Sequence, residues 1–193
     1  KKPVSWVLKM PLLDKVVLNK IRETLMNAFG GEFSQIIIGG APLNAEVEAF
    51  LRRIKFPVTV GYGMTETAPL ISFTPWTDFR SQSCGQVLKG FMDARIANPD
   101  MDGVGEIQVR GENVMAGYYK NEQATKESFT ADGWLRTGDL GIIDKDGFIY
   151  IKGRCKTMLL GPSGQNIYPE EIEAKINNMP YVLESLVLQK EDT

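Results

Sequence analysis

The amino-acid sequence predicts an α/β fold with a βαβ parallel-sheet core, then a β-rich subdomain, then the beginning of a small α+β C-terminal domain. Helical and strand-like runs alternate over residues 1–85, whereas short β-type runs separated by turns fill residues 86–153. Residues 154–193 are only about 40 in number, near the lower limit for independent folding. We therefore expect them to be an incomplete domain.

Two amphipathic helices are predicted in the first segment. Residues 14–29 place apolar side chains three and four positions apart, and the pair Gly30-Gly31 is typical of a helix C-cap. The expected buried face of this helix consists of Leu18, Ile21, Leu25 and Phe29. Asn44 can cap a second helix. Its expected buried face consists of Val47, Phe50, Leu51 and Ile54.

Two short apolar runs flank the second helix and predict strands. Residues 35–38 are too short for a helix and too apolar for an exposed edge, so this strand should be buried. Residues 56–60 form the second strand. A strand, a helix and a strand with short connections make a βαβ unit, whose strands are parallel with a right-handed crossover. The glycine-rich turns at 39–42 and 61–67 should then share the carboxyl edge, where open parallel sheets bind ligands.

The second turn, Gly61-Tyr62-Gly63-Met64-Thr65-Glu66-Thr67, carries groups that suit a phosphate. Glycine permits positive φ and close approach to the backbone, and the two hydroxyls and the carboxylate suit a phosphate oxygen and a hard cation such as Mg²⁺. An ordinary strand-to-loop turn with solvated side chains is the alternative for this heptapeptide alone. The chain has no histidine, so it contains no Ser-His-Asp or Cys-His arrangement.

The rest of the chain is predicted to be mostly β structure. Strands are expected at 94–97 and 105–111, and a short helix at 122–129. Residues 140–143 and 148–151 flank the turn Asp144-Lys145-Asp146-Gly147, which predicts a hairpin. Pro169 favours the first position of a helix, and a strand-like run at 183–188 follows.

Charge and composition exclude several classes of protein. The 22 basic and 24 acidic residues are interspersed and leave a net charge of −2, so no nucleic-acid partner is expected. No apolar run approaches the roughly 20 residues that span a bilayer, so no transmembrane segment is expected, which leaves peripheral membrane contact open. Cys84 and Cys155 form no CxxC pair and are too few for a disulfide framework. We therefore expect a reducing, cytoplasmic location.

Several motifs, taken in order, resemble the adenylate-forming (AMP-binding) superfamily, and within it the AMP-forming acyl-CoA synthetases of the long-chain fatty-acid ligase type. The motifs are Tyr62-Gly63-Met64-Thr65-Glu66, Gly105-Glu106 with Arg110-Gly111, Trp134-Leu135-Arg136-Thr137-Gly138-Asp139, and Gly153-Arg154 through Pro169-Glu170-Glu171-Ile172-Glu173. The resemblance covers nearly the whole chain. It implies that residues 1–153 end a large N-terminal domain and that residues 154–193 open a small mobile one.

The resemblance also implies a nucleotide site. Its expected contacts are Gly40, Ala41, Pro42, Gly61, Tyr62, Gly63, Met64, Thr65, Asp139, Ile151 and Arg154. Among these, the turn 40–42 and Tyr62 would enclose the adenine, and Ile151 would pack near the base.

The phosphate and ribose contacts implied by the resemblance have separate roles. Thr65 would hydrogen-bond the α-phosphate and Glu66 would hold Mg²⁺, which makes these two the expected catalytic residues. Asp139 would accept both ribose hydroxyls, because a carboxylate is a natural acceptor for a vicinal diol. Arg154 would contact the ribose. A turn aspartate after a glycine is the plain alternative for Asp139.

The family reaction runs in two halves. An acid and ATP give an acyl-adenylate and pyrophosphate, and a thiol, usually that of coenzyme A, then displaces AMP. The small domain rotates between the halves about a hinge, which the resemblance places at Lys156. Thr157 departs from the family pattern, in which an acidic residue is common there.

The expected function is therefore part of a fatty acyl-CoA synthetase that uses ATP, a fatty acid, coenzyme A and Mg²⁺. The alternatives are an adenylation domain that loads a carrier-protein thiol and a nucleotide-binding module without turnover. The family's phosphate-binding loop would precede Lys1 and its catalytic lysine would follow Thr193. We therefore expect the chain to be a fragment that is inactive by itself.

Overall fold

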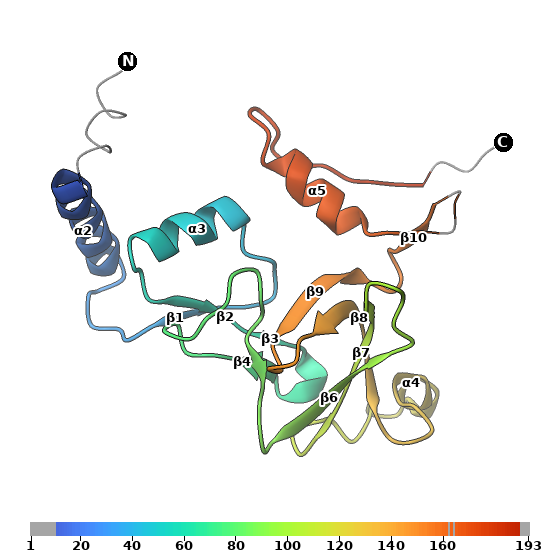
Figure 1. Ribbon diagram of the computed structural model, residues 1–193. Coiled ribbons are helices and arrows are strands. Elements are labelled where there is room, and N and C mark those ends of the chain that lie inside the picture. The colour runs from blue at the N-terminus through green and yellow to red at the C-terminus, as the bar shows by residue number, and fades with distance from the viewer. Residues whose placement is uncertain (1–10, 162, 164, 190–193) are drawn as a thin grey trace.

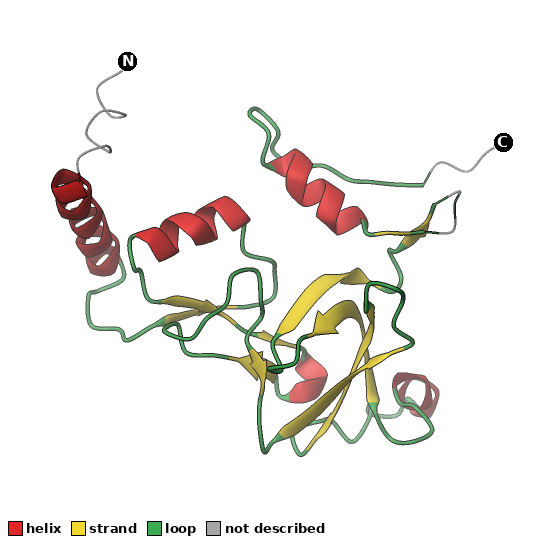
Figure 2. Ribbon diagram, in the orientation of Figure 1, coloured by secondary structure: helices red, strands yellow, loops and turns green. Residues whose placement is uncertain are grey.

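The computed structural model describes residues 11–161, 163 and 165–189 and shows a mixed α/β fold, as predicted (Figures 1 and 2). Its helices are α2 (Pro11–Ala28), α3 (Ala45–Arg53), the short 3-10 helix η1 (Thr65–Thr67), α4 (Glu122–Ser128) and α5 (Pro169–Asn177). The strands of the first half are β1 (Ile36–Ile38), β2 (Val58–Val60), β3 (Tyr62–Gly63), β4 (Leu70–Phe73) and β5 (Gln86–Val87). The later strands are β6 (Met92–Ala97), β7 (Gly105–Gly111), β8 (Leu135–Ile143), β9 (Ile149–Arg154), β10 (Leu159–Leu160) and β11 (Asn166–Ile167).

The first unit is the predicted βαβ arrangement. Strands β1 and β2 pair in parallel, with Ile36 opposite Val58 and Ile38 opposite Val60. Helix α3 connects them and lies above them in Figure 1, with α2 beside it. Leu18, Ile21 and Leu25 of α2 pack on the core formed by Ile54, Phe56 and Val58, which confirms the amphipathic helix. The Asn44 side chain accepts hydrogen bonds from the backbone of Glu46 and Val47 and so caps α3 as expected.

Three expectations about burial in this unit are wrong. Phe29 is expected on the buried face of the first helix, but it lies beyond the end of α2 and is 63% exposed. Strand β1 is not buried, since Ile37 is 51% exposed and β2 is its only partner among the described strands. On α3, Val47 and Phe50 are exposed, whereas Glu48 is buried. The Glu48 carboxylate accepts hydrogen bonds from the Ser81 hydroxyl and from the Gln82 backbone and side chain, so a distant polar loop covers this part of the helix.

The β-rich part consists of two antiparallel sheets with the strand orders β3-β4-β5 and β6-β7-β8-β9. They share one core, which consists of Tyr62, Ile71, Met92, Ile107, Val109, Leu135 and Ile149. The predicted hairpin joins β8 to β9. One Asp144 carboxylate oxygen accepts hydrogen bonds from the Asp146 and Phe148 backbone N–H groups, each at 2.9 Å, which closes its turn. Because β3 belongs to the first of these sheets, the second glycine-rich turn is packed directly against the β-rich part.

The last unit begins with the β10–β11 pair, after which α5 starts at Pro169 as expected and packs along β9. The Lys152 ammonium and the Glu171 carboxylate, 2.9 Å apart, join these two elements. The strand expected at 183–188 does not form, because the segment has no ladder partner within the described residues. Its Val187 N–H donates to the Glu173 side chain instead. No helix in the described ranges is long and apolar enough to cross a membrane.

Candidate functional site

The carboxyl ends of β1 and β2 bring the two glycine-rich turns together. The Gly61 N–H donates to the Ile38 carbonyl at 2.9 Å, and a Cβ added to Gly39 would lie 3.5 Å from the Gly61 carbonyl oxygen. Gly40 has a φ of 82°, which favours glycine, and the Gly40-Ala41-Pro42 segment is exposed. The two turns therefore form one accessible edge, as expected from the parallel pairing.

The second turn is more ordered than its glycines suggest. Tyr62 and Gly63 form β3, which pairs with β4, and η1 follows. Gly63 is required by crowding rather than by positive φ, because a Cβ there would lie 1.8 Å from the Pro69 carbonyl oxygen. The Met64 N–H donates to that same oxygen at 2.8 Å.

The polar side chains of η1 have different environments. Thr65 is exposed, whereas Thr67 is fully buried and its hydroxyl contacts the carbonyls of Met64 and Pro69. The expectation that both hydroxyls could meet a phosphate is therefore wrong for Thr67. Its polar group is already used inside the turn.

Glu66 is the acidic group of this edge. Its Oε1 accepts a hydrogen bond of 2.6 Å from the Tyr118 hydroxyl, while Oε2 has no hydrogen-bond partner among the described residues. Within the described residues, no group of three or more Asp, Glu, His or Cys side chains is arranged so that it could hold a metal ion. A single carboxylate with a free oxygen still fits Mg²⁺, which proteins commonly hold through one or two carboxylates together with substrate phosphates.

Asp139 joins the edge to the β-rich part. It is 9% exposed, and its Oδ2 accepts a hydrogen bond of 2.7 Å from the Tyr62 hydroxyl. Its Oδ1 lies 3.4 Å from the Arg154 Nε. Burial, with the nearby Asp139 charge as a smaller contribution, raises the pKa of Tyr62 above its ordinary range, so this hydroxyl stays protonated and donates.

The β8–β9 ladder places Arg154 directly opposite Asp139. The pairing passes from Leu140 opposite Gly153 to Gly141 opposite Ile151, so Lys152 is an extra residue in β9 and forms a bulge. Arg154 is largely exposed and free to reach a ligand at this edge. Ile151 is half-buried in the same strand.

Two further groups of this region are Cys84, which lies near the Asp139 charge, and Lys156, which follows the end of β9. Lys156 is exposed and follows Cys155, whose N–H still donates to the Gly138 carbonyl at 2.8 Å. Lys156 is therefore the first residue after the last backbone contact with β8. Burial raises the pKa of the Cys84 thiol to about 11, which keeps it neutral and unreactive at neutral pH.

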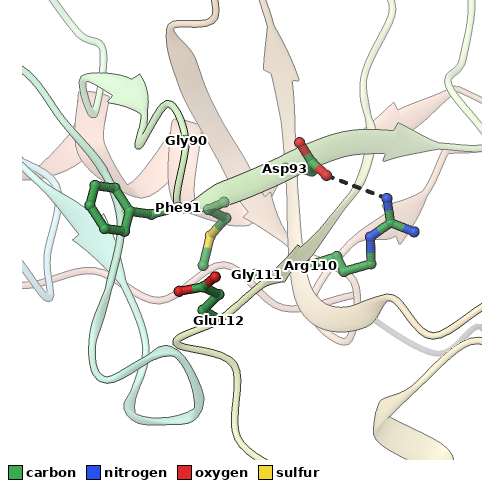
Figure 3. Close-up of a pocket in the computed structure, with 7 residues that line it drawn as sticks. Gly90, Phe91, Asp93, Arg110, Gly111 and Glu112 are labelled. Carbon is green, nitrogen blue, oxygen red and sulfur yellow. Dashed lines mark hydrogen bonds and ion pairs between the residues drawn. The ribbon is translucent and has the colours of Figure 1, made fainter.

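Two open hollows are lined by residues other than the predicted nucleotide contacts. One, of about 390 Å³, is lined by residues 90–93 and 110–112, with Asp93 and Arg110 paired across it at 3.3 Å (Figure 3). The other, of about 540 Å³, lies beside Tyr118 and α4. Neither contains a predicted nucleotide contact. The convergent polar groups around Asp139 and Glu66 therefore locate the candidate site better than these hollows, whose polar side chains are mostly solvated.

Sequence reasoning did not find two contacts of this site. The Tyr62–Asp139 hydrogen bond joins residues 77 positions apart, and the Tyr118–Glu66 bond joins residues 52 apart. The pattern Gly117-Tyr118-Tyr119 does not indicate which tyrosine contacts Glu66. Pairings over such distances depend on how the sheets pack, which a single sequence does not display.

The fold and the order of the motifs place this chain in a known family of enzymes. The chain belongs to the AMP-binding enzyme family, whose sequence pattern matches residues 6–119. It is 36% identical over 180 residues to the long-chain-fatty-acid–CoA ligase FadD15 of Mycobacterium bovis, covering 93% of this chain and 28% of that protein. It is 38% identical over 178 residues to ACSBG2 of Gallus gallus, another long-chain-fatty-acid–CoA ligase, covering 92% of this chain and 23% of that protein.

Solved structures agree in fold. The o-succinylbenzoate CoA synthetase MenE of Bacillus subtilis, in complex with its acyl-adenylate intermediate, matches with a TM-score of 0.74 at 32% identity, covering 89% of this chain and 37% of that one. ATP-bound MatB of Rhodopseudomonas palustris matches with a TM-score of 0.69 at 36% identity, covering 82% of this chain and 32% of that one. The chain spans about a quarter of the length of the curated relatives that it matches.

Proposed function

We propose that the chain is part of an ATP-dependent fatty acyl-CoA synthetase. Such an enzyme joins a fatty acid to AMP with release of pyrophosphate and then transfers the acyl group to the thiol of coenzyme A with release of AMP. The observation that carries the proposal is the Tyr62–Asp139–Arg154 contact, which joins three separate motifs at the edge where the glycine-rich turns meet. The names of the curated relatives support the fatty-acid and coenzyme A parts of the proposal.

Asp139 is the group that we assign to the ribose. A carboxylate offers about four acceptor positions, so one hydrogen bond from Tyr62 leaves Asp139 able to accept from a vicinal diol. Tyr62 holds the carboxylate in one orientation, and the guanidinium of Arg154 balances its charge at the edge. The exposed turn 40–42 then supplies the surface for the base.

Thr65 and Glu66 are the groups that we assign to the phosphates. The exposed Thr65 hydroxyl can donate to a phosphate oxygen, and the free oxygen of Glu66 would hold Mg²⁺, which supplies charge neutralisation there. Adenylation needs charge neutralisation and positioning rather than a strong base. A site without histidine therefore suits it.

Lys156 is our candidate for the hinge between the two half-reactions. It is exposed and lies just beyond the last backbone contact of β8 with the chain after β9, so rotation there breaks few contacts. The chain after it is attached to the rest mainly by single polar contacts such as Lys152–Glu171.

The test is acid-dependent release of pyrophosphate from ATP, measured with a panel of fatty acids. It should be run on the 193-residue chain and on the full-length protein that contains it. We expect release from the full-length protein and none from the short chain. Free coenzyme A should then be converted to thioester, whereas conversion of a carrier-protein thiol alone would favour a carrier-loading enzyme. AMP binding without pyrophosphate release by the full-length protein would contradict the proposal.

A further inference from the structure

The loop between β7 and α4, residues 112–121, holds the turn that carries Glu66. The Met115 N–H donates to the Glu66 carbonyl at 2.8 Å, and the Asn113 amide donates to the Thr67 carbonyl at 2.6 Å. The Tyr118 hydroxyl donates to the Glu66 carboxylate at 2.6 Å. One loop therefore fixes both the backbone and the side chain of Glu66.

Tyr118 is itself held in place by α4. Its N–H donates to the Thr125 hydroxyl at 2.8 Å, and that hydroxyl donates to the Asn121 carbonyl at 2.9 Å. Gly117 allows this approach, because a Cβ there would lie 2.6 Å from the Thr125 methyl carbon. The Asn121 side chain caps α4 by accepting from the Ala124 N–H. The Tyr118 backbone is thus held by a regular element as well as by its loop.

We propose that Tyr118 is a positioning residue, which orients the Glu66 carboxylate so that Oε1 is held by the phenol and Oε2 is presented to a divalent cation. This inference rests on the proposed function. A carboxylate on a surface turn can otherwise rotate between several rotamers, and fixing it lowers the cost of ordering it when the cation binds.

The test compares two matched variants in the full-length enzyme, Tyr118→Phe and Tyr119→Phe. Each loses one phenolic hydroxyl, but Tyr119 is 88% exposed and its hydroxyl makes no hydrogen bond within the described residues. Pyrophosphate release is measured against Mg²⁺ concentration at saturating ATP and fatty acid. Tyr118→Phe should raise the half-saturating Mg²⁺ concentration by about 10-fold. Loss of a hydrogen-bond partner of a metal ligand typically weakens metal binding by about 10- to 100-fold, and we expect the lower value because Tyr118 is partly exposed. High Mg²⁺ should restore most of kcat, and Tyr119→Phe should behave as wild type.

A binding readout separates positioning from a purely structural role. Mn²⁺ binding in the presence of AMP, followed by EPR, should weaken by a similar factor in Tyr118→Phe, while a Glu66→Gln background should largely abolish the difference. If the Mg²⁺ and Mn²⁺ dependence of Tyr118→Phe is unchanged, or if high Mg²⁺ does not restore its kcat, the positioning role of Tyr118 is wrong. In that case an active wild-type enzyme would still support the proposed function. An inactive wild type would overturn both.

Discussion

Replacing Tyr62 by phenylalanine should destabilise the fold, because it removes the donor to a buried carboxylate oxygen. Tyr62 is 7% exposed and Asp139 is 9% exposed, so water has little access to replace the lost donor. Hydrogen bonds to charged groups contribute about 1.5–3 kcal/mol, and phenylalanine fills nearly the same volume, so little cavity cost is added. We expect the free energy of unfolding to fall by about 2 kcal/mol.

The assay is urea unfolding of the 193-residue chain, followed by tryptophan fluorescence. With a urea dependence of about 2–3 kcal/mol per M, the expected loss moves the midpoint down by roughly 1 M. The control is Tyr150→Phe, in strand β9, because the Tyr150 hydroxyl makes no hydrogen bond within the described residues. Equal midpoints for the two variants would show that the Tyr62–Asp139 bond contributes nothing and would refute the reasoning.

Three further predictions concern the same region. In the full-length protein, Asp139→Ala should weaken ATP use by about 2–3 kcal/mol, measured as kcat/KM for ATP in pyrophosphate release, and a wild-type value would remove Asp139 from the ribose site. Gly63→Ala should destabilise by about 1–3 kcal/mol because its Cβ meets the Pro69 carbonyl, whereas Gly39→Ala, with a 3.5 Å contact, should change the thermal midpoint little. The raised pKa of Tyr62 means that the folded chain keeps a proton that the unfolded chain releases near pH 10. The contribution of Tyr62 to the free energy of unfolding should therefore be complete below pH 10 and decrease above it, by at most about 1.4 kcal/mol per pH unit. Above pH 10, the urea midpoint of Tyr62→Phe should fall less steeply with pH than that of the wild type.

The parts of the fold that local patterns determine could be predicted. The 14–29 periodicity, the Asn44 cap, the Asp144 turn and Pro169 each act through residues a few positions away, and the structure contains the corresponding elements. The parallel pairing of β1 and β2 could also be predicted, because a short strand-helix-strand unit has few alternatives. These inferences located the edge where the two turns meet.

The remaining features depend on which distant segment covers a surface. Periodicity identified an apolar face of α3, but only the position of the 81–82 loop explains why Glu48 is buried instead of Val47. Residues 183–188 have strand-like composition, yet composition alone cannot supply a partner. The burial of Thr67 likewise follows from a fold-back onto Pro69 rather than from its place in the motif.

The bulge at Lys152 determines how many residues separate Asp139 from Arg154 as well as the contact between them. Without an extra residue, the register of Ile142 opposite Tyr150 would continue to Asp139 opposite Gly153, and Arg154 would face the other side of the sheet. The interval of fifteen positions between the aspartate and the arginine is therefore fourteen for an uninterrupted hairpin plus one for the bulge. A homologous chain with the same turn length but an interval of fourteen should have a regular ladder and keep the pair only by losing the residue equivalent to Lys152. Losing the residue equivalent to Lys152 would also remove the cation that joins β9 to α5. Counting the residues between these two side chains thus indicates, in a related sequence, whether the cation that joins β9 to α5 is kept.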